Sequence, residues 1–243
     1  MKNFSQFSLL LLLLSVPPAF AADENDSACV ILLHGLYRSG YSMKAVEWHL
    51  EEDYHVVNIS YPSLFFPIEE LADTAIEEGL AGCRLADISP IHFVTHSMGG
   101  ILVRQYLAHH EIPELGRVVM MGPPNQGSKF AANLIDNPML DIFLPVAATQ
   151  LAAGAESLPA LLGPVAYPVG IIAGSNNNRP WTPSGPIGPS DGTVLVEETR
   201  VAGMTDFITV PASHSFLMWH DFVLEQVSHF LNHGSFRHTG EEE

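Results

Sequence analysis

The sequence contains few cations. Of its 243 residues only 10 are Lys or Arg, against 27 Asp or Glu, so the formal net charge is −17 with neutral histidines. Proteins bind nucleic acid largely through Lys and Arg against the phosphates, and no two of these cations are adjacent in the sequence. A nucleic-acid partner is therefore not expected.

Long hydrophobic runs are also lacking. No apolar run reaches the roughly 20 residues that cross a bilayer as a helix, so no stable membrane anchor is expected. Residues 1–22 instead resemble a secretory signal: Lys2 gives the positive start, Leu9–Leu14 the apolar centre and Ala19–Ala21 the small-x-small cleavage pattern. We expect the mature chain, residues 23–243, to form one domain that is exported, either to the periplasm or fully secreted.

The sequence has two cysteines and no pattern typical of a metal or phosphate site. It contains no His-Glu-x-x-His, no cysteine cluster and no glycine-rich phosphate loop. Asp136 and Asp141 could bind calcium, but two carboxylates in a polar loop are usually only solvated. We therefore expect no metal and no cofactor. Export would allow Cys29 and Cys83 to form a disulfide, although two separate buried thiols are an equal alternative.

The composition, 47% hydrophobic and 15% charged, is that of a globular protein with a large core. Short apolar runs rich in Val and Ile alternate with longer amphipathic segments. Such runs are typical of strands in a parallel sheet that is covered by helices on both faces. The predicted strands are 29–33, 55–59, 91–95, 117–121, 169–173 and 207–210, and the predicted helices are 41–52, 67–85, 98–109 and 216–232. This alternation predicts an α/β fold.

Two stretches interrupt the alternation. Residues 127–163 form a long insertion with apolar residues at helical spacing, which could be a small helical cap over a site or a helix packed on the sheet. Residues 179–192 carry four prolines with interleaved glycines, which predicts a stiff loop without helix.

Ser97 lies between a predicted buried strand and a predicted helix, in the segment Thr95-His-Ser-Met-Gly-Gly100. A nucleophile elbow occupies this position in hydrolases, where the sharp turn holds the serine hydroxyl clear of the sheet. A helix-capping serine is the alternative. Capping does not explain two glycines in the first helical turn, where they destabilise a helix, so we interpret Ser97 as a nucleophile.

A serine nucleophile needs a base to take its proton. His214 follows the last predicted strand at its carboxyl end, the edge where catalytic groups of open α/β sheets gather. His96 adjoins the serine but should point elsewhere on the elbow, and His220 falls inside a predicted helix. His214 is therefore the predicted base.

The orienting acid is predicted to be Asp191, at the end of the proline-rich loop. Along the chain these residues follow the order Ser97, Asp191, His214, which is the order expected of an α/β fold with a nucleophile elbow. An Asp-Gly turn is the alternative role for Asp191. Asp206 should lie at the opposite edge of the sheet, whereas Glu197 and Glu198 remain open as candidates.

An oxyanion intermediate needs backbone donors. The Met98 amide follows the nucleophile at a helix start. The Leu36 amide follows Gly35 in the loop after the first predicted strand. We predict that these two amides form an oxyanion hole.

Together these positions resemble the α/β-hydrolases of the bacterial lipase and esterase type, including the lipase-like branch with GPI-inositol deacylases. The resemblance rests on five segments: 34–36, 95–99, 122–128, 190–194 and 213–215. It implies a mostly parallel central sheet flanked by helices, with Ser97, His214 and Asp191 as the triad and Leu36 and Met98 as oxyanion donors. One departure is Thr95, which replaces the first glycine of the elbow pattern.

The predicted function is hydrolysis of a carboxylic ester, small or lipid-like, through an acyl-enzyme. Leu36, Met98, Phe65, Phe66 and the insertion from 139 to 162 are candidates for an apolar acyl pocket. An acyltransferase would use the same triad, and a thioesterase or amidase is chemically close. A non-catalytic binding protein could also retain this scaffold. The partner proteins, the natural ester and the oligomeric state do not follow from the sequence.

Overall fold

The computed structural model describes residues 28–135, 144–177 and 188–238. Its centre is one six-stranded sheet in the order β2-β1-β3-β4-β5-β6, with every neighbouring pair parallel. The strands are β1 (Cys29–Leu33), β2 (His55–Ile59), β3 (Ile91–His96), β4 (Leu115–Met121), β5 (Val169–Gly174) and β6 (Asp206–Val210). The predicted parallel sheet is confirmed, and each strand begins and ends within two residues of its predicted bounds.

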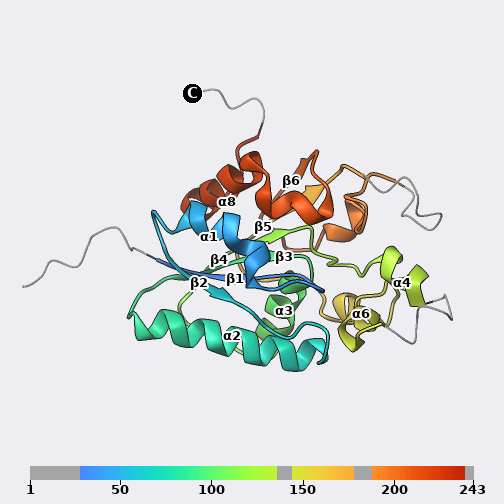
Figure 1. Ribbon diagram of the computed structural model, residues 1–243, viewed down its shortest axis with the longest axis horizontal. Helices are drawn as coiled ribbons and strands as arrows, with labels where there is room; N and C mark the ends of the chain where they lie inside the picture. The colour runs from blue at the N-terminus through green and yellow to red at the C-terminus, as the bar shows by residue number, and fades with distance from the viewer. Residues whose placement is uncertain (1–27, 136–143, 178–187, 239–243) are drawn as a thin grey trace, which may run out of the picture.

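Helices cover both faces of the sheet (Figure 1). One face carries α1 (Lys44–Leu50) and α8 (Asp221–His233), and the other carries α2 (Ile68–Leu85) and α3 (Met98–Leu107). Successive strand side chains point to opposite faces. In β1, Ile31 therefore packs in the core beneath α2 and α3, whereas Val30 and Leu32 pack in the core beneath α1 and α8.

Two predicted helices are each divided in the structure. The segment predicted as 216–232 contains the 3-10 helix η3 (His214–Trp219) followed by α8, with His220 extended between them. The segment predicted as 41–52 contains the 3-10 helix η1 (Gly40–Met43) and then α1. The prediction of continuous helices was wrong because apolar residues keep helical spacing across both breaks.

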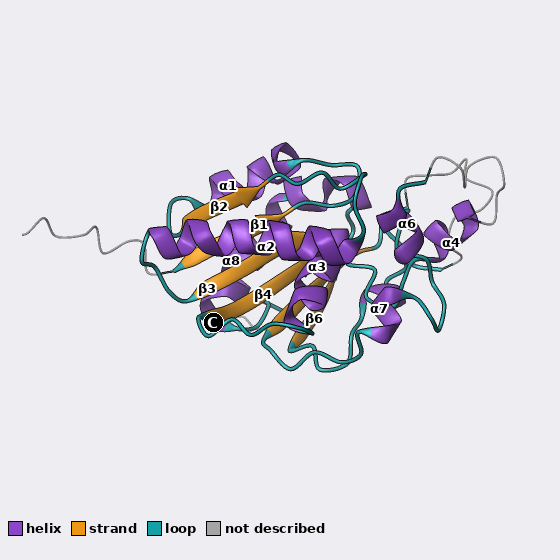
Figure 2. Cartoon of the chain, turned by 90° about the horizontal axis from the view of Figure 1, so that it is seen from below, coloured by secondary structure: helices purple, strands orange, loops and turns teal. Residues whose placement is uncertain are grey.

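The insertion lies beyond the carboxyl edge of the sheet (Figure 2). Its described helices are α4 (Lys129–Ile135), α6 (Val146–Gln150) and α7 (Leu158–Leu161). A short parallel bridge between Ser128 and Ala152 closes its base. There the Ser128 amide donates to the carbonyl of Leu151 at 2.8 Å, and the Ala153 amide donates to the carbonyl of Ser128 at 3.0 Å.

Some predicted features lie outside the described residues. These are the signal sequence, both candidate calcium ligands Asp136 and Asp141, the insertion residues 136–143, and residues 179–187 of the proline-rich loop. None of the described helices is long and apolar enough to cross a bilayer.

Cys29 and Cys83 form a disulfide, with Cα atoms 5.8 Å apart. It links the first residue of β1 to the last turn of α2. Because it joins residues 54 positions apart, the chain-entropy model assigns it about 4 kcal/mol of stabilisation. Of the two alternatives left open by the sequence, the structure has the disulfide.

Candidate active site

Ser97 occupies a sharp turn between β3 and α3. Its backbone has φ 53° and ψ −121°, a conformation that costs a residue with a side chain about 1–3 kcal/mol. A Cβ atom at Gly99 would lie 2.6 Å from the carbonyl oxygen of Leu33, so only glycine fits there. Thr95, at the departure from the elbow pattern, is fully buried in β3, and the turn forms with threonine in place of glycine.

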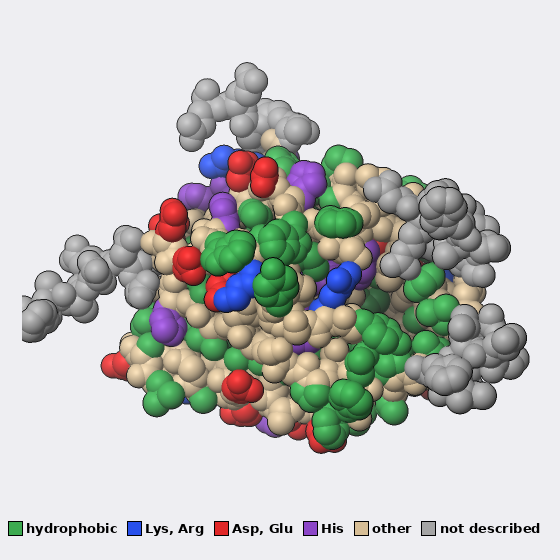
Figure 3. Space-filling view, in the orientation of Figure 1, with side chains coloured by type: hydrophobic (Ala, Val, Ile, Leu, Met, Phe, Trp, Pro, Cys, Tyr) green, Lys and Arg blue, Asp and Glu red, His purple; other side chains and the backbone are tan. Residues whose placement is uncertain are grey.

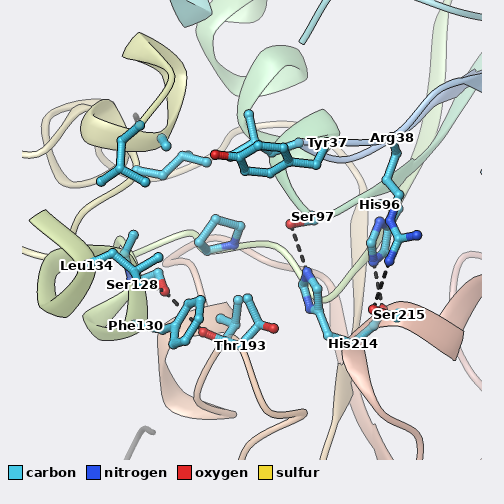
Figure 4. Close-up of a pocket in the computed structure, with 17 residues that line it drawn as sticks. Tyr37, Arg38, His96, Ser97, Ser128, Phe130, Leu134, Thr193, His214 and Ser215 are labelled. Carbon is cyan, nitrogen blue, oxygen red and sulfur yellow. Dashed lines mark hydrogen bonds between the residues drawn. The ribbon is translucent and has the colours of Figure 1, made fainter. Parts of the chain in front are cut away.

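Three side chains meet at the carboxyl edge of the sheet (Figure 4). The Ser97 Oγ lies 3.0 Å from His214 Nε2, and His214 Nδ1 lies 2.6 Å from Asp191 Oδ2. A carboxylate only accepts hydrogen bonds, so Nδ1 carries the proton and Nε2 keeps a lone pair for the serine hydroxyl. The structure thus brings the predicted nucleophile, base and acid into one hydrogen-bonded chain.

The Asp191 carboxylate is held by its own loop. The side chain is fully buried, and its Oδ1 accepts hydrogen bonds from the amides of Thr193 at 2.9 Å and Val194 at 2.8 Å. The amide of His214 also donates to the Asp191 carbonyl at 2.9 Å. The acid and the base are therefore tied through both backbone and side chain.

Gly122, after β4, supports this pair from behind. Its φ is +59°, and a Cβ atom there would lie 3.1 Å from Asp191 Oδ2 and 3.2 Å from His214 Nδ1. The residues that form or support the site thus lie in the segments that follow four neighbouring strands, β3 to β6.

The Met98 amide, at the first position of α3, has no partner within the helix. Across the described residues, neither this amide nor that of Leu36 donates to another backbone group. The loop at Leu36 is held by His34, whose Nδ1 donates to the Gly35 carbonyl at 2.8 Å. His34 Nε2 accepts from the Tyr61 amide at 3.2 Å. Burial lowers the pKa of His34, which keeps the ring neutral for this arrangement.

A cavity of about 450 Å³ opens beside Ser97. Its wall away from His214 is apolar and comes from the insertion, with contributions from Phe130, Ala131, Leu134, Leu144, Ala148 and Leu151. Of the other predicted pocket residues, Leu36 lines the cavity. Met98 is instead fully buried in the core, and Phe65 is 76% exposed elsewhere on the surface. Phe66 and the α7 leucines are also absent from the wall.

The model for one family, described as alpha/beta hydrolase family, matches residues 30–232. The chain belongs to this family. A comparison with curated proteins found no match.

This hydrolase also shares its fold with solved structures. It is 18% identical, at a TM-score of 0.65, to the mature form of a Bacillus licheniformis lipase, covering 88% of this chain and 96% of the lipase. An esterase from Thermogutta terrifontis is 15% identical at a TM-score of 0.57, with 86% and 91% covered. The type II thioesterase of the yersiniabactin pathway is 16% identical at 0.55, with 88% and 97% covered.

The other histidines considered as bases make different contacts in this hydrolase. His96 Nε2 donates to the carbonyl of His214 at 2.9 Å, not to Ser97. Complete burial, reinforced by the nearby His214, holds the pKa of His96 well below its usual range, so the ring stays neutral. His220 precedes α8 as its N-cap residue and does not line the cavity.

The other acids also lie apart from the base. Asp206 is at the amino end of β6, as predicted, where it accepts hydrogen bonds from the Phe236 amide and from His238. Glu197 is exposed and pairs with Arg200. Glu198 accepts from the amides of Leu195 and Lys129, and burial raises its pKa. It joins the Asp191 loop to the start of α4.

Three residues that line the cavity were not predicted from the sequence: Phe130, Leu134 and Arg38. The spacing of Phe130 and Leu134, four residues apart within the insertion, was a signal for one helix face. Nothing local in the sequence distinguishes Arg38 from a solvated arginine. Within the described ranges, no group of three His, Cys, Asp or Glu side chains is placed to hold a metal ion.

Proposed function

We propose that this protein is a serine hydrolase of carboxylic esters with Ser97 as nucleophile, His214 as base and Asp191 as its partner. The observation that carries the proposal is the hydrogen-bonded chain of these three side chains opening on a largely apolar cavity. The lipase and esterase among the structural neighbours agree with this chemistry.

The reaction proceeds in two steps. His214 Nε2 takes the proton of Ser97 as Oγ attacks the ester carbonyl, and the same proton then goes to the leaving alcohol. Water, activated by His214, hydrolyses the acyl-enzyme and frees Ser97. Asp191 keeps the imidazole in the required tautomer and stabilises its positive charge during each attack.

The Leu36 and Met98 amides receive the negative charge that develops on the carbonyl oxygen. Each such donor contributes about 2.7–4 kcal/mol to transition-state stabilisation. The acyl chain occupies the apolar wall formed by the insertion, which acts as a cap over the site. An aliphatic acyl chain longer than acetyl is the substrate that this wall favours.

We also infer that the protein acts after export. The signal pattern over residues 1–22 supports export, and the Cys29–Cys83 disulfide is typical of an oxidising compartment. Export argues against coenzyme A thioesters as substrates for this member of the family, although a thioesterase shares the fold.

The test is hydrolysis of p-nitrophenyl esters, from acetyl to palmitoyl, by the mature chain and by Ser97→Ala. We expect activity to rise beyond acetyl and to disappear in the variant. Ser175→Ala is the matched control, because Ser175 lies at the same sheet edge but outside the cavity. If the wild type hydrolyses no ester and a fluorophosphonate probe does not label Ser97, the protein is a binding protein instead.

A second pair of variants tests the acid. Asp191→Asn should lower kcat on the order of 10⁴-fold, since the amide favours the wrong imidazole tautomer. Asp206→Asn alters a carboxylate that also bonds a histidine, at the opposite sheet edge, and should leave kcat unchanged. Equal losses in both variants would contradict the assignment.

A further inference from the structure

Arg38 is the one Lys, Arg, Asp or Glu side chain lining the Ser97 cavity in the described part of the chain. It also lines an adjoining groove of about 890 Å³, which runs between η1 and η3 and includes Tyr41, Phe216 and Trp219. Arg38 therefore stands where the cavity meets the groove.

The guanidinium of Arg38 has no carboxylate partner among the described residues. Its Nη2 donates to Ser215 Oγ at 2.8 Å, and none of the ion pairs involves it. The side chain is exposed. In a chain with 27 acids and 10 cations, an exposed cation that stays unpaired beside the nucleophile is available to an anionic ligand.

Arg38 connects the loop that carries the Leu36 amide with the segment that carries His214. It follows the Leu36 amide by two residues, and its partner Ser215 is the residue after His214. The hydroxyl of Ser215 accepts from Arg38 and keeps its own proton free to donate. An anion bound here would receive a charge-assisted bond from Arg38 and a hydroxyl bond from Ser215.

The apolar wall and Arg38 lie on opposite sides of Ser97. Figure 4 shows Phe130 and Leu134 on one side of the serine, with Arg38 and Ser215 on the other. An ester bound across Ser97 would place its acyl chain on the apolar side and its alcohol beside Arg38. On the outer surface, hydrophobic side chains gather next to a few basic ones (Figure 3), which suits an alcohol that is itself amphiphilic.

We propose that Arg38 and Ser215 form a subsite for an anionic group, a phosphate or a carboxylate, on the leaving alcohol of the substrate. The inference rests on the proposed esterase function and names its substrate class. The Ser97 Oγ forms a bond to the acyl carbon, the bond to the alcohol oxygen breaks, and the serine proton leaves with the anionic alcohol through His214.

The experiment compares three octanoyl esters: 1-octanoylglycerol 3-phosphate, octanoyl glycolate and neutral 1-octanoylglycerol. We expect the wild type to prefer an anionic ester by about 10–100-fold in kcat/KM, the range of a charge-assisted hydrogen bond. The phosphate and carboxylate arms identify which anion is bound. The preference should weaken with added salt, because the site is exposed.

Arg38→Gln should bring the ratio of kcat/KM for the anionic ester to that for the neutral ester down to about one, and Arg38→Lys should restore part of this ratio. Lys44→Gln is the matched control: it removes one cation that pairs with Glu47 outside the cavity, so it should keep the preference. Ser215→Ala provides a second variant, in which the same ratio should fall by a smaller factor.

Two outcomes would overturn the anion subsite without refuting the proposed esterase function. If the wild type hydrolyses neutral and anionic esters equally, the esterase stands and the anion subsite falls. If Arg38→Gln lowers kcat/KM equally for all three esters, Arg38 only positions the loops. Absence of any hydrolysis together with absence of fluorophosphonate labelling would instead refute the proposed function itself.

Discussion

Gly122 allows a sharp test of how closely the Asp191–His214 pair is packed. Gly122→Ala would place a methyl group 3.1 Å from Asp191 Oδ2 and 3.2 Å from His214 Nδ1, whereas ordinary contacts begin near 3.4 Å. Leu217, whose Cδ1 would lie 3.0 Å away, and the Asp191–His214 pair must therefore give way by a few tenths of an ångström. Because a misplacement of about 1 Å can cost roughly 10²-fold in rate, we expect kcat to fall by about tenfold.

The same substitution also strains the backbone. Alanine at φ +59° should cost about 1–2 kcal/mol of stability. Gly163→Ala is the matched control, since Gly163 has φ +66° and a Cβ atom there would meet nothing within 4 Å. It should lose similar stability but keep full kcat.

The assay is kcat for a p-nitrophenyl ester together with urea unfolding of both variants. If Gly122→Ala loses stability like Gly163→Ala while its kcat remains that of the wild type, the reasoning is refuted. The packing behind the pair would then have no influence on catalysis.

Three further predictions concern stability. Burial and the Arg117 cation lower the pKa of His92 to about 4 in the folded protein, whereas the pKa of this histidine in the unfolded chain is about 6.5. Between these values only the unfolded chain binds the proton. The free energy of unfolding should therefore fall by about 1.4 kcal/mol per pH unit as the pH drops from about 6 towards 4. The free energy of unfolding of His92→Gln, measured with urea at several pH values in this range, should depend less steeply on pH than that of the wild type. Replacing Cys29 and Cys83 together by alanine should cost about 4 kcal/mol in urea unfolding under non-reducing conditions, and a loss below about 1 kcal/mol would contradict the estimate. Arg104→Leu removes the donor to three backbone carbonyls and should lower stability by about 3 kcal/mol, visible as a reduced melting temperature.

The strands and the order of the site residues could be predicted from the sequence because their signals are local. Contiguous Val and Ile mark buried parallel strands, and Ser97 is flanked by the glycines that a tight elbow needs. His214 and Asp191 could be placed at the carboxyl edge because each follows a strand, and in a parallel sheet the carboxyl ends of the strands share one edge.

Features that depend on contacts between distant residues could not be predicted. The stacking of His34 on Tyr61, with ring centroids 3.9 Å apart, joins two loops that are adjacent only because β1 and β2 pair. Phe65 was expected in the acyl pocket from its hydrophobicity alone, but the loop after β2 directs it to solvent. Hydrophobicity indicates that a side chain favours burial, not which surface it meets.

The bridge between Ser128 and Ala152 brings the two ends of the insertion together. Its described parts are held at further points, because Gln150 bonds to the Ile68 amide and to Glu69, and the Lys129 amide donates to Glu198. The chain leaves and re-enters the hydrolase domain at neighbouring positions, so a different segment grafted between them would start and end at the same place on the domain. Under the proposed esterase function, exchanging this one segment would change the apolar wall of the cavity, while the sheet, the elbow and the acid loop keep their sequence.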